Sequence, residues 1–329
     1  MKTIASVSLD LDNQWSYMKT NGDRGWEDFP SYLDVAVPRI LQFLKDRDLK
    51  ITFFVVGQDA VLEKNRGAIT AIAEAGHEIG NHSFSHEPWL HLYSKSEIVA
   101  EFERTEEALE RITGKRPTAF RGPGYSLSPA VLETLIERSY EYDCSLLPTY
   151  IAPLARAYFF LNSSKMSDEE KAKRKRLFGK FSDGSQTLKP HFIAGSDQSI
   201  VEVPVTTFPV IKTPIHASYL QYLATFSPAV ARSYWHTALA ACSATGVEPS
   251  FLLHPLDFLG GEDVRALKFF PGMRNTSERK LAFLSDVFDA LAARFDAVSV
   301  GEHVARFRQL QATANKIAGR HTSRASTAQ

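Results

Sequence analysis

The chain has 329 residues, of which 44% are hydrophobic and 11% aromatic, so it can bury a sizeable core. Lysine plus arginine and aspartate plus glutamate are balanced at 38 each, so bulk charge gives no reason to expect nucleic-acid binding. Two cysteines do not make a disulfide framework, the first residues lack the pattern of a signal peptide, and no apolar run has the length of a membrane span. We therefore expect a cytoplasmic protein without a transmembrane segment.

Short apolar runs alternate with longer segments of helical periodicity. In chain order we expect strand 4–9, helix 31–45, strand 51–56, helix 59–75, strand 77–80, helix 96–113, strands 118–121, 140–143, 200–205 and 250–254, helix 277–295 and strand 297–300. Alternation of this kind predicts an α/β fold with a parallel sheet. Because there are seven or eight strands and no glycine-rich dinucleotide motif, a distorted or partly closed (β/α) barrel is favoured over an open doubly wound sheet.

One segment breaks this rhythm. We interpret residues 1–313 as a single catalytic domain with an insertion at about residues 146–199. Within the insertion, Ser167 and Glu170 form a capping-box pattern at the start of a basic helix. The basic residues 171–176 are either a solvated helix face or a contact with an anionic lipid or glycan. The small, polar residues 314–329 predict a disordered tail.

The first predicted strand ends in two acidic residues. Side chains alternate along a strand, so Ser8, Asp10 and Asp12 share one face. Neighbouring carboxylates repel each other, and burial penalises both unless a cation or a proton compensates. A polar strand end that opens into solvent is the alternative, but structure alone rarely requires such a pair.

His82 and His86 follow the predicted strand 77–80. On a helical turn, two histidines four residues apart point the same way and can chelate one ion. This spacing alone is a weak signal, because it also arises by chance among structural histidines. Its place in a loop after a strand shifts the balance, and two histidines with one aspartate suit zinc or a similar divalent ion.

Further polar residues occupy equivalent places. Arg121, Asp143 and His254 each end a predicted strand. The carboxyl ends of barrel strands are where the active sites of (β/α) barrels lie. This shared position is the strongest indication from the residues alone that the chain is an enzyme.

At these positions the sequence resembles the polysaccharide deacetylases, the NodB-homology group of carbohydrate esterase family 4. Its five motifs have counterparts in the same order, namely LDLD at 9–12, HSFSH at 82–86, RGPGY at 121–125, an aspartate at Asp143 and LLHP at 252–255. The resemblance implies a NodB-like barrel that removes an N-acetyl or other short acyl group from an amino sugar. It also implies one divalent ion held by Asp12, His82 and His86, zinc first, with cobalt, nickel or iron as alternatives.

The resemblance further implies a role for each remaining motif residue. Asp10 would be the base that activates water, oriented by Arg121, and His254 would be the acid that protonates the leaving amine, supported by Asp143. Leu252 would line the pocket for the acetyl methyl group.

The sequence departs from the family pattern in several places. Leu11 separates the two aspartates of the first motif, the fourth motif lacks its tryptophan, and a proline follows His254. Because Gly124 precedes Tyr125, in the reverse of the common order, either backbone amide could stabilise the oxyanion.

Other functions stay open at this point. The scaffold could hydrolyse a non-glycan amide such as a formyl group or a ureide, or it could be a degenerate glycan-binding protein. An iron oxygenase would leave Arg121, Asp143 and His254 without roles. We expect the substrate to be an N-acylated amino sugar in a glycan or in a lipid- or nucleotide-linked precursor, with peripheral membrane contact as one possibility.

Overall fold

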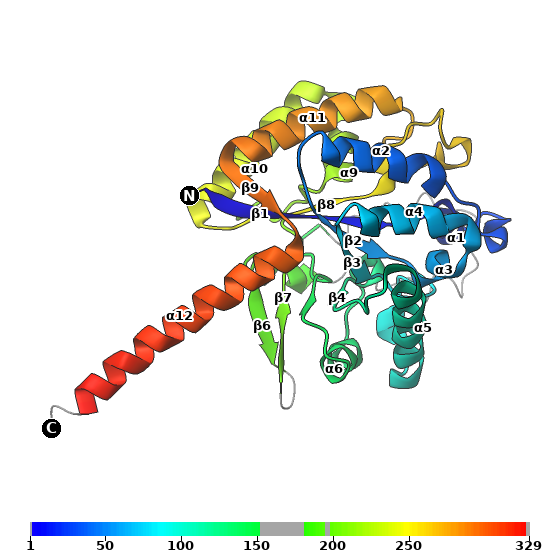
Figure 1. Cartoon of the computed structure of the whole chain (residues 1–329). Coiled ribbons are helices and arrows are strands. Elements are labelled where there is room, and N and C mark those ends of the chain that lie inside the picture. The colour runs from blue at the N-terminus through cyan, green and yellow to red at the C-terminus, as the bar shows by residue number, and fades with distance from the viewer. Residues whose placement is uncertain (1, 152–180, 195–197, 327–329) are drawn as a thin grey trace.

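The structure is a computed structural model and describes residues 2–151, 181–194 and 198–326. A single sheet runs through the described residues (Figure 1). Its strands are β1 (Thr3–Leu11), β2 (Thr52–Val55), β3 (Glu78–Asn81), β4 (Ala119–Phe120), β5 (Tyr142–Asp143), β6 (His191–Ala194), β7 (Ser199–Glu202), β8 (Ser250–Leu253) and β9 (Phe295–Val298). The order is β6-β7-β5-β4-β3-β2-β1-β8, and β9 also pairs with β1.

The expected α/β fold with a partly closed barrel is confirmed. Every strand pair is parallel except β6 with β7, and in the described part of the chain the curled sheet ends at β6 and β8. The antiparallel strand β6 was not expected; it brings the number of described strands to nine and lies within the predicted insertion.

The long strand β1 separates an apolar core from a polar interior. Val7, Leu9 and Leu11 belong to the main hydrophobic core, while Ser8 and Asp10 lie on the opposite face and are also buried. Because side chains alternate along the strand, the Asp10 carboxylate points away from the apolar core but is still buried. This arrangement requires charged or hydrogen-bonding partners on that face.

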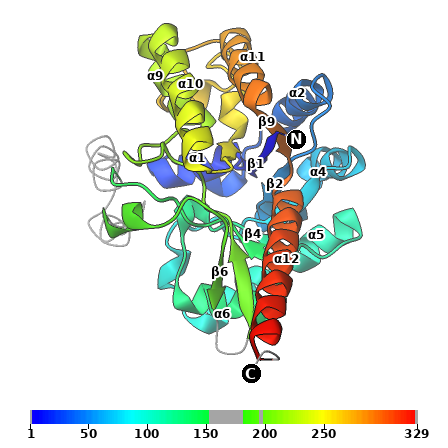
Figure 2. The same cartoon turned by 90° about the vertical axis from the view of Figure 1, so that its left-hand side faces the viewer.

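Helices cover the sheet and form the remaining layers (Figures 1 and 2). They are α1 (Gln14–Asn21), α2 (Leu33–Lys45), α3 (Gly57–Val61), α4 (Glu63–Glu74), α5 (Lys95–Thr113), α6 (Pro129–Glu137), α9 (Ala217–Phe226), α10 (Pro228–Thr245), α11 (Ser277–Arg294) and α12 (Val300–Ser326). Helices α2, α4, α9, α10 and α11 contribute to the core that contains Val7 and Leu9. Helices α5 and α6 pack in a separate cluster with Phe120 of β4 and Ile200 of β7.

The expected helix over residues 59–75 is in fact two helices. Leu62 has extended backbone angles, which divide α3 from α4. Helix α3 begins at Gly57, where an added Cβ would lie 2.6 Å from Thr105 Oγ1 and 2.7 Å from the ring of Phe84. Close packing at Gly57 therefore sets where the short helix α3 begins. Hydrophobic periodicity alone does not reveal such a contact, so it does not separate α3 from α4.

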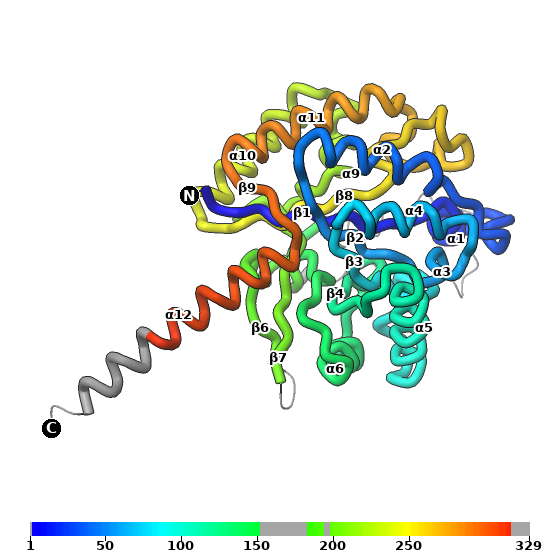
Figure 3. The backbone as a smooth tube through the Cα atoms, in the orientation of Figure 1, coloured from blue at the N-terminus to red at the C-terminus, as the bar shows by residue number. Residues whose placement is uncertain are grey.

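The C-terminal region also differs from expectation. Strand β9 begins two residues earlier than predicted, at Phe295, whose ring is buried in the core. Helix α12 continues to Ser326, across most of the segment expected to be a disordered tail. Its coloured part leads away from β9 and from the sheet (Figure 3). Its first turns are held by Val300 and Val304 in the core, whereas residues 308–316 are exposed. Local helix propensity, rather than packing, accounts for this outer part.

The basic helix predicted to begin at Ser167 lies outside the described residues. In the part of the chain that the structure describes, none of the helices combines the length and the hydropathy of a membrane-spanning segment.

Candidate metal and catalytic site

A buried ion pair joins the ends of β1 and β4. The Arg121 side chain is fully buried, and its Nη1 donates to Asp10 Oδ1 at 2.7 Å and to Ser8 Oγ at 2.9 Å. Its Nε donates to the carbonyl of Cys144 at 3.0 Å. Burial alone would lower the pKa of Arg121, but the Asp10 carboxylate outweighs burial and raises it. Arg121 therefore stays charged beside an oriented carboxylate.

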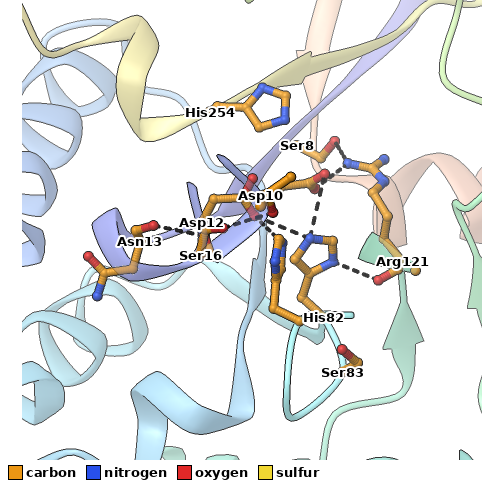
Figure 4. Close-up of polar contacts among 12 residues, drawn as sticks. Ser8, Asp10, Asp12, Asn13, Ser16, His82, Ser83, Arg121 and His254 are labelled. Carbon is orange, nitrogen blue, oxygen red and sulfur yellow. Dashed lines mark hydrogen bonds and ion pairs between the residues drawn. The ribbon is translucent and has the colours of Figure 1, made fainter. Parts of the chain in front are cut away.

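Asp12, His82 and His86 converge on one point next to this pair. Figure 4 shows Asp12 and His82 beside Asp10 and Arg121. Asp12 Oδ1 lies 3.3 Å from His82 Nε2 and 2.9 Å from His86 Nε2. One potential ligand atom from each residue lies within 4.8 Å of the other two. Asp10 Oδ2 is 4.0 Å from His82 Nε2, so the prospective base borders the same point.

The hydrogen bonds around His82 suit a metal ligand. His82 Nδ1 lies 2.6 Å from the carbonyl oxygen of Arg121, which fixes Nδ1 as the donor and leaves Nε2 facing Asp12. Burial lowers the pKa of His82, but Asp10 and Asp12 outweigh it and raise this pKa. Burial raises the pKa of Asp12, but His86 and His82 hold it well below its ordinary value. This donor set of two imidazoles and one carboxylate fits a divalent ion that would take the place of the shared protons.

The loop that carries the histidines is not the helical turn we expected. Ser83 and His86 have φ values of 59° and 50°, both in the left-handed region. The Glu101 carboxylate holds this loop, because its Oε2 accepts the amides of Phe84 and Ser85 at 2.9 and 2.7 Å. The two rings therefore meet through loop geometry rather than through helical periodicity.

His254 ends β8 and projects toward the carboxylates from the other side (Figure 4). Its Nδ1 lies 3.1 Å from Ser218 Oγ, and its backbone amide donates to Asp257 Oδ2 at 2.8 Å. Asp143, the expected support of His254, instead accepts from the Ser145 hydroxyl at 2.6 Å and lies opposite Glu202 on the neighbouring strand. Among the described residues, the structure thus assigns His254 partners from α9 and from its own turn.

The third-motif loop and Leu252 occupy tightly packed positions. Gly124 and Tyr125 have φ values of 58° and 61°, and the Tyr125 amide donates to the Gly122 carbonyl at 3.0 Å. Leu252 is fully buried in β8, where its Cα pairs with that of Ser8. Leu252 therefore lies on the strand next to the one that bears Asp10.

Comparisons with known proteins find similarity to one family. Residues 23–143 match the family model of polysaccharide deacetylases. Over this segment the chain is similar to the polysaccharide deacetylase family. The matched segment contains both histidines and Arg121, whereas Asp10, Asp12 and His254 lie outside it.

Two relatives and one solved structure illustrate the family. A peptidoglycan deacetylase of Helicobacter pylori is 30% identical over 157 residues, which cover 46% of this chain and 52% of that protein. A peptidoglycan-N-acetylglucosamine deacetylase of Bacillus cereus is 41% identical over 86 residues, covering 26% and 30%. A Mycobacterium smegmatis crystal structure assigned as a polysaccharide deacetylase shares the fold, with a TM-score of 0.63, 22% identity and coverage of 94% and 92%. The chain spans about half or less of the length of these two relatives.

Sequence reasoning missed several residues that support the site. Asp59 Oδ1 accepts hydrogen bonds from Asn13, Trp15 and Asn65 at 2.7, 3.0 and 2.8 Å, which fixes the segment directly after Asp12. Asp59 comes shortly after the end of β2. The expectation that functional residues follow the carboxyl ends of strands could therefore have found it. Asp257 lies three residues after His254, a capping-box spacing that could likewise have been recognised.

The metal site can be tested by metal content. We expect about one divalent ion per chain in the wild type and none in an Asp12→Ala, His82→Ala double variant, because two of three ligands are removed. Mass spectrometry of purified protein after incubation with zinc, cobalt or nickel measures this, and exposed His236→Gln is the matched control that should keep its metal. Affinity should fall as the pH decreases, because protons compete for His82, whose pKa is raised. A wild type that stays empty with all three metals contradicts the assignment.

Asp59 should give the metal-free protein a specific pH dependence. Burial raises its pKa from 3.8 to about 7, so between these values the folded state binds a proton that the unfolded state has lost. Stability should therefore fall as the pH rises from about 4 to about 7. From pH 5 to pH 8 we expect the wild type to lose on the order of 2 kcal/mol more than Asp59→Asn in urea unfolding with chelator. Exposed Asp34→Asn controls for the loss of one charge, and parallel curves for wild type and Asp59→Asn would refute the shift.

Proposed function

We propose that this chain is a metal-dependent hydrolase that removes an N-acetyl or other short acyl group from an amino sugar of a glycan or glycan precursor. The observation that carries the proposal is the convergence of Asp12, His82 and His86 beside the buried Asp10–Arg121 pair. The names of the two relatives, which describe deacetylases of peptidoglycan, support the substrate class.

A divalent ion held by Asp12, His82 and His86, with zinc suiting the donor set best, would polarise the attacking water and the acyl carbonyl. Asp10 takes the proton from the water as its oxygen bonds to the acyl carbon. Arg121 holds one oxygen of Asp10, so the other oxygen can accept that proton. The C–N bond then breaks as His254 donates a proton to the leaving amine, which yields a carboxylate and a free amine.

We assign the oxyanion donor to Gly124 rather than to Tyr125. The amide of Tyr125 already donates to the Gly122 carbonyl, so it is not available to a ligand. The positive φ of Gly124 turns the backbone at this point, and an added Cβ would lie 3.1 Å from Pro88. The loop can therefore hold a backbone donor in a fixed place, which is what oxyanion stabilisation requires. Leu252 remains our candidate for the wall of the acetyl pocket.

The closest polar contacts of His254 suggest how it is oriented. Ser218 holds Nδ1 and Asp257 holds the backbone amide, so Nε2 is the nitrogen that would deliver the proton. That the substrate is a lipid- or nucleotide-linked precursor in the cytoplasm remains a prediction. Assays on such precursors beside mature glycans test it.

The proposal predicts that two substitutions lower kcat without removing the metal. Asp10→Asn keeps an oxygen that can accept from Arg121, so it should keep the metal at reduced stability but lower kcat by roughly 10²–10⁴. His254→Ala should lower kcat by a similar factor, because each variant removes one proton-transfer step. Acetate release from N-acetylated sugar oligomers and from nucleotide- and lipid-linked amino sugars measures this. The control His216→Gln alters a ring whose centroid lies 6.2 Å from that of His254 and should retain most activity.

Three outcomes would count against the proposal. Near wild-type kcat in either variant would exclude that residue from its proton-transfer role. Hydrolysis confined to formyl or ureide substrates would favour a non-glycan amidohydrolase. Metal binding and glycan binding without any hydrolysis would favour the glycan-binding alternative.

A further inference from the structure

Two acidic residues lie side by side in the sheet behind the candidate site. Asp143 of β5 and Glu202 of β7 are direct Cα partners, and both side chains are completely buried. The proposed hydrolysis does not use Glu202. Structural carboxyls in such a place cost free energy unless each oxygen has a partner.

The oxygen atoms of this pair can be accounted for one by one. Asp143 Oδ1 accepts from the Ser145 hydroxyl at 2.6 Å, and Glu202 Oε1 accepts from the amide of Leu146 at 3.0 Å. The remaining oxygens, Asp143 Oδ2 and Glu202 Oε2, are buried and have no donor among the described residues. The two residues occupy paired positions on adjacent strands, and each carboxyl group influences the pKa of the other. Two carboxylate oxygens cannot hydrogen-bond to each other unless a proton lies between them.

We propose that Asp143 and Glu202 share one proton at neutral pH, and that this pair fixes the loop 122–125 through Ser145. Glu202 is then a positioning residue for the reaction. The inference rests on the proposed function for its catalytic consequence, but not for the sharing of the proton.

The link to the loop is a short chain of hydrogen bonds. Ser145 uses its hydroxyl hydrogen on Asp143, and its oxygen accepts the amide of Gly122 at 2.8 Å. The loop passes so close to itself at Gly122 that no side chain fits there, because an added Cβ would lie 2.2 Å from the carbonyl oxygen of Ser126. If Asp143 moved, Ser145 would move with it, and the hydrogen bond from Ser145 to Gly122 would shift the turn that carries the Gly124 amide.

Electrostatics favours a single negative charge on the pair. Burial raises the pKa of Asp143, and burial with the charge of Asp143 raises the pKa of Glu202 well above its ordinary value. Arg121 is the neighbouring cation, but it is already paired with Asp10 at 2.7 Å. A second negative charge would thus have no ion-pair partner within 4.0 Å among the described residues.

Infrared spectroscopy of the full-length chain tests the shared proton directly. At pH 7, the wild type minus Glu202→Gln difference spectrum should contain the carbonyl stretch of a protonated carboxylic acid. Glu106→Gln is the matched control, since Glu106 is a buried glutamate paired with Arg138 and Arg116, whose pull lowers its pKa despite burial. Its difference spectrum should show the loss of a carboxylate instead. Absence of the acid band in the Glu202→Gln difference would overturn the proposal.

Kinetics on the substrate found by acetate release tests the positioning role. Glu202→Gln keeps a donor to Asp143 and should change kcat by less than about threefold, whereas Ser145→Ala and Glu202→Leu should lower kcat about tenfold with little change in KM. That loss is smaller than the roughly 10²–10³ seen when an oxyanion donor itself is removed. Folded Ser145→Ala and Glu202→Leu proteins with unchanged kcat would overturn the positioning role.

The two proposals fail in distinguishable ways. If no substrate is hydrolysed, the proposed function falls, and the infrared result alone decides whether the proton is shared. If hydrolysis is present and the acid band is missing, the proposed function stands and the inference about Glu202 falls.

Discussion

The buried guanidinium of Arg121 is the constraint on which the rest of the site depends. A buried cation needs partners, and two of its nitrogens, Nε and Nη1, donate to the Cys144 carbonyl, the Ser8 hydroxyl and the Asp10 carboxylate, while Nη2 has no partner among the described residues. Its own carbonyl oxygen accepts from His82. One residue at the end of β4 therefore ties together β1, the segment after β5 and the histidine loop. Removal of one partner from a buried ion pair typically costs about 3–5 kcal/mol, so the base, the metal ligands and the local fold are coupled.

The parallel sheet explains why residues so far apart in sequence meet here. Arg121 and Asp10 are separated by 111 positions, and His86 and Asp12 by 74, yet each pair is within hydrogen-bonding distance. Parallel strands place all their carboxyl ends at one edge, and the loops that follow can then supply ligands, base and acid independently. The cost is that carboxylates and imidazoles are buried close together. In the metal-free chain, hydrogen bonds between Asp12 and the two histidines offset part of this cost. A divalent ion at the same place can take over that role.

Much of this arrangement was predictable from the sequence, for identifiable reasons. Buried parallel strands have nearly continuous apolar sequences, so β1, β2 and β8 were found close to their true positions. The strand-end rule brought Asp12, His82 and His86 together, although the local reasoning was wrong, since left-handed residues and the Glu101 carboxylate shape that loop. The break at Leu62 and the outer part of α12 depend on close packing or local propensity, which periodicity does not report.

The positions of functional residues were easier to predict than their partners. A motif fixes where Asp143 and His254 stand on their strands, but which side chain each meets depends on lateral register and on the loops between strands. Asp143 lies opposite Glu202 in the sheet, so its carboxyl group is directed to a neighbour that no motif names. His254 takes its support from Asp257, three residues further along the same turn, and from Ser218 on α9. The orientation of the prospective acid is therefore independent of β5, which leaves Asp143 to organise the turn at Gly122 through Ser145.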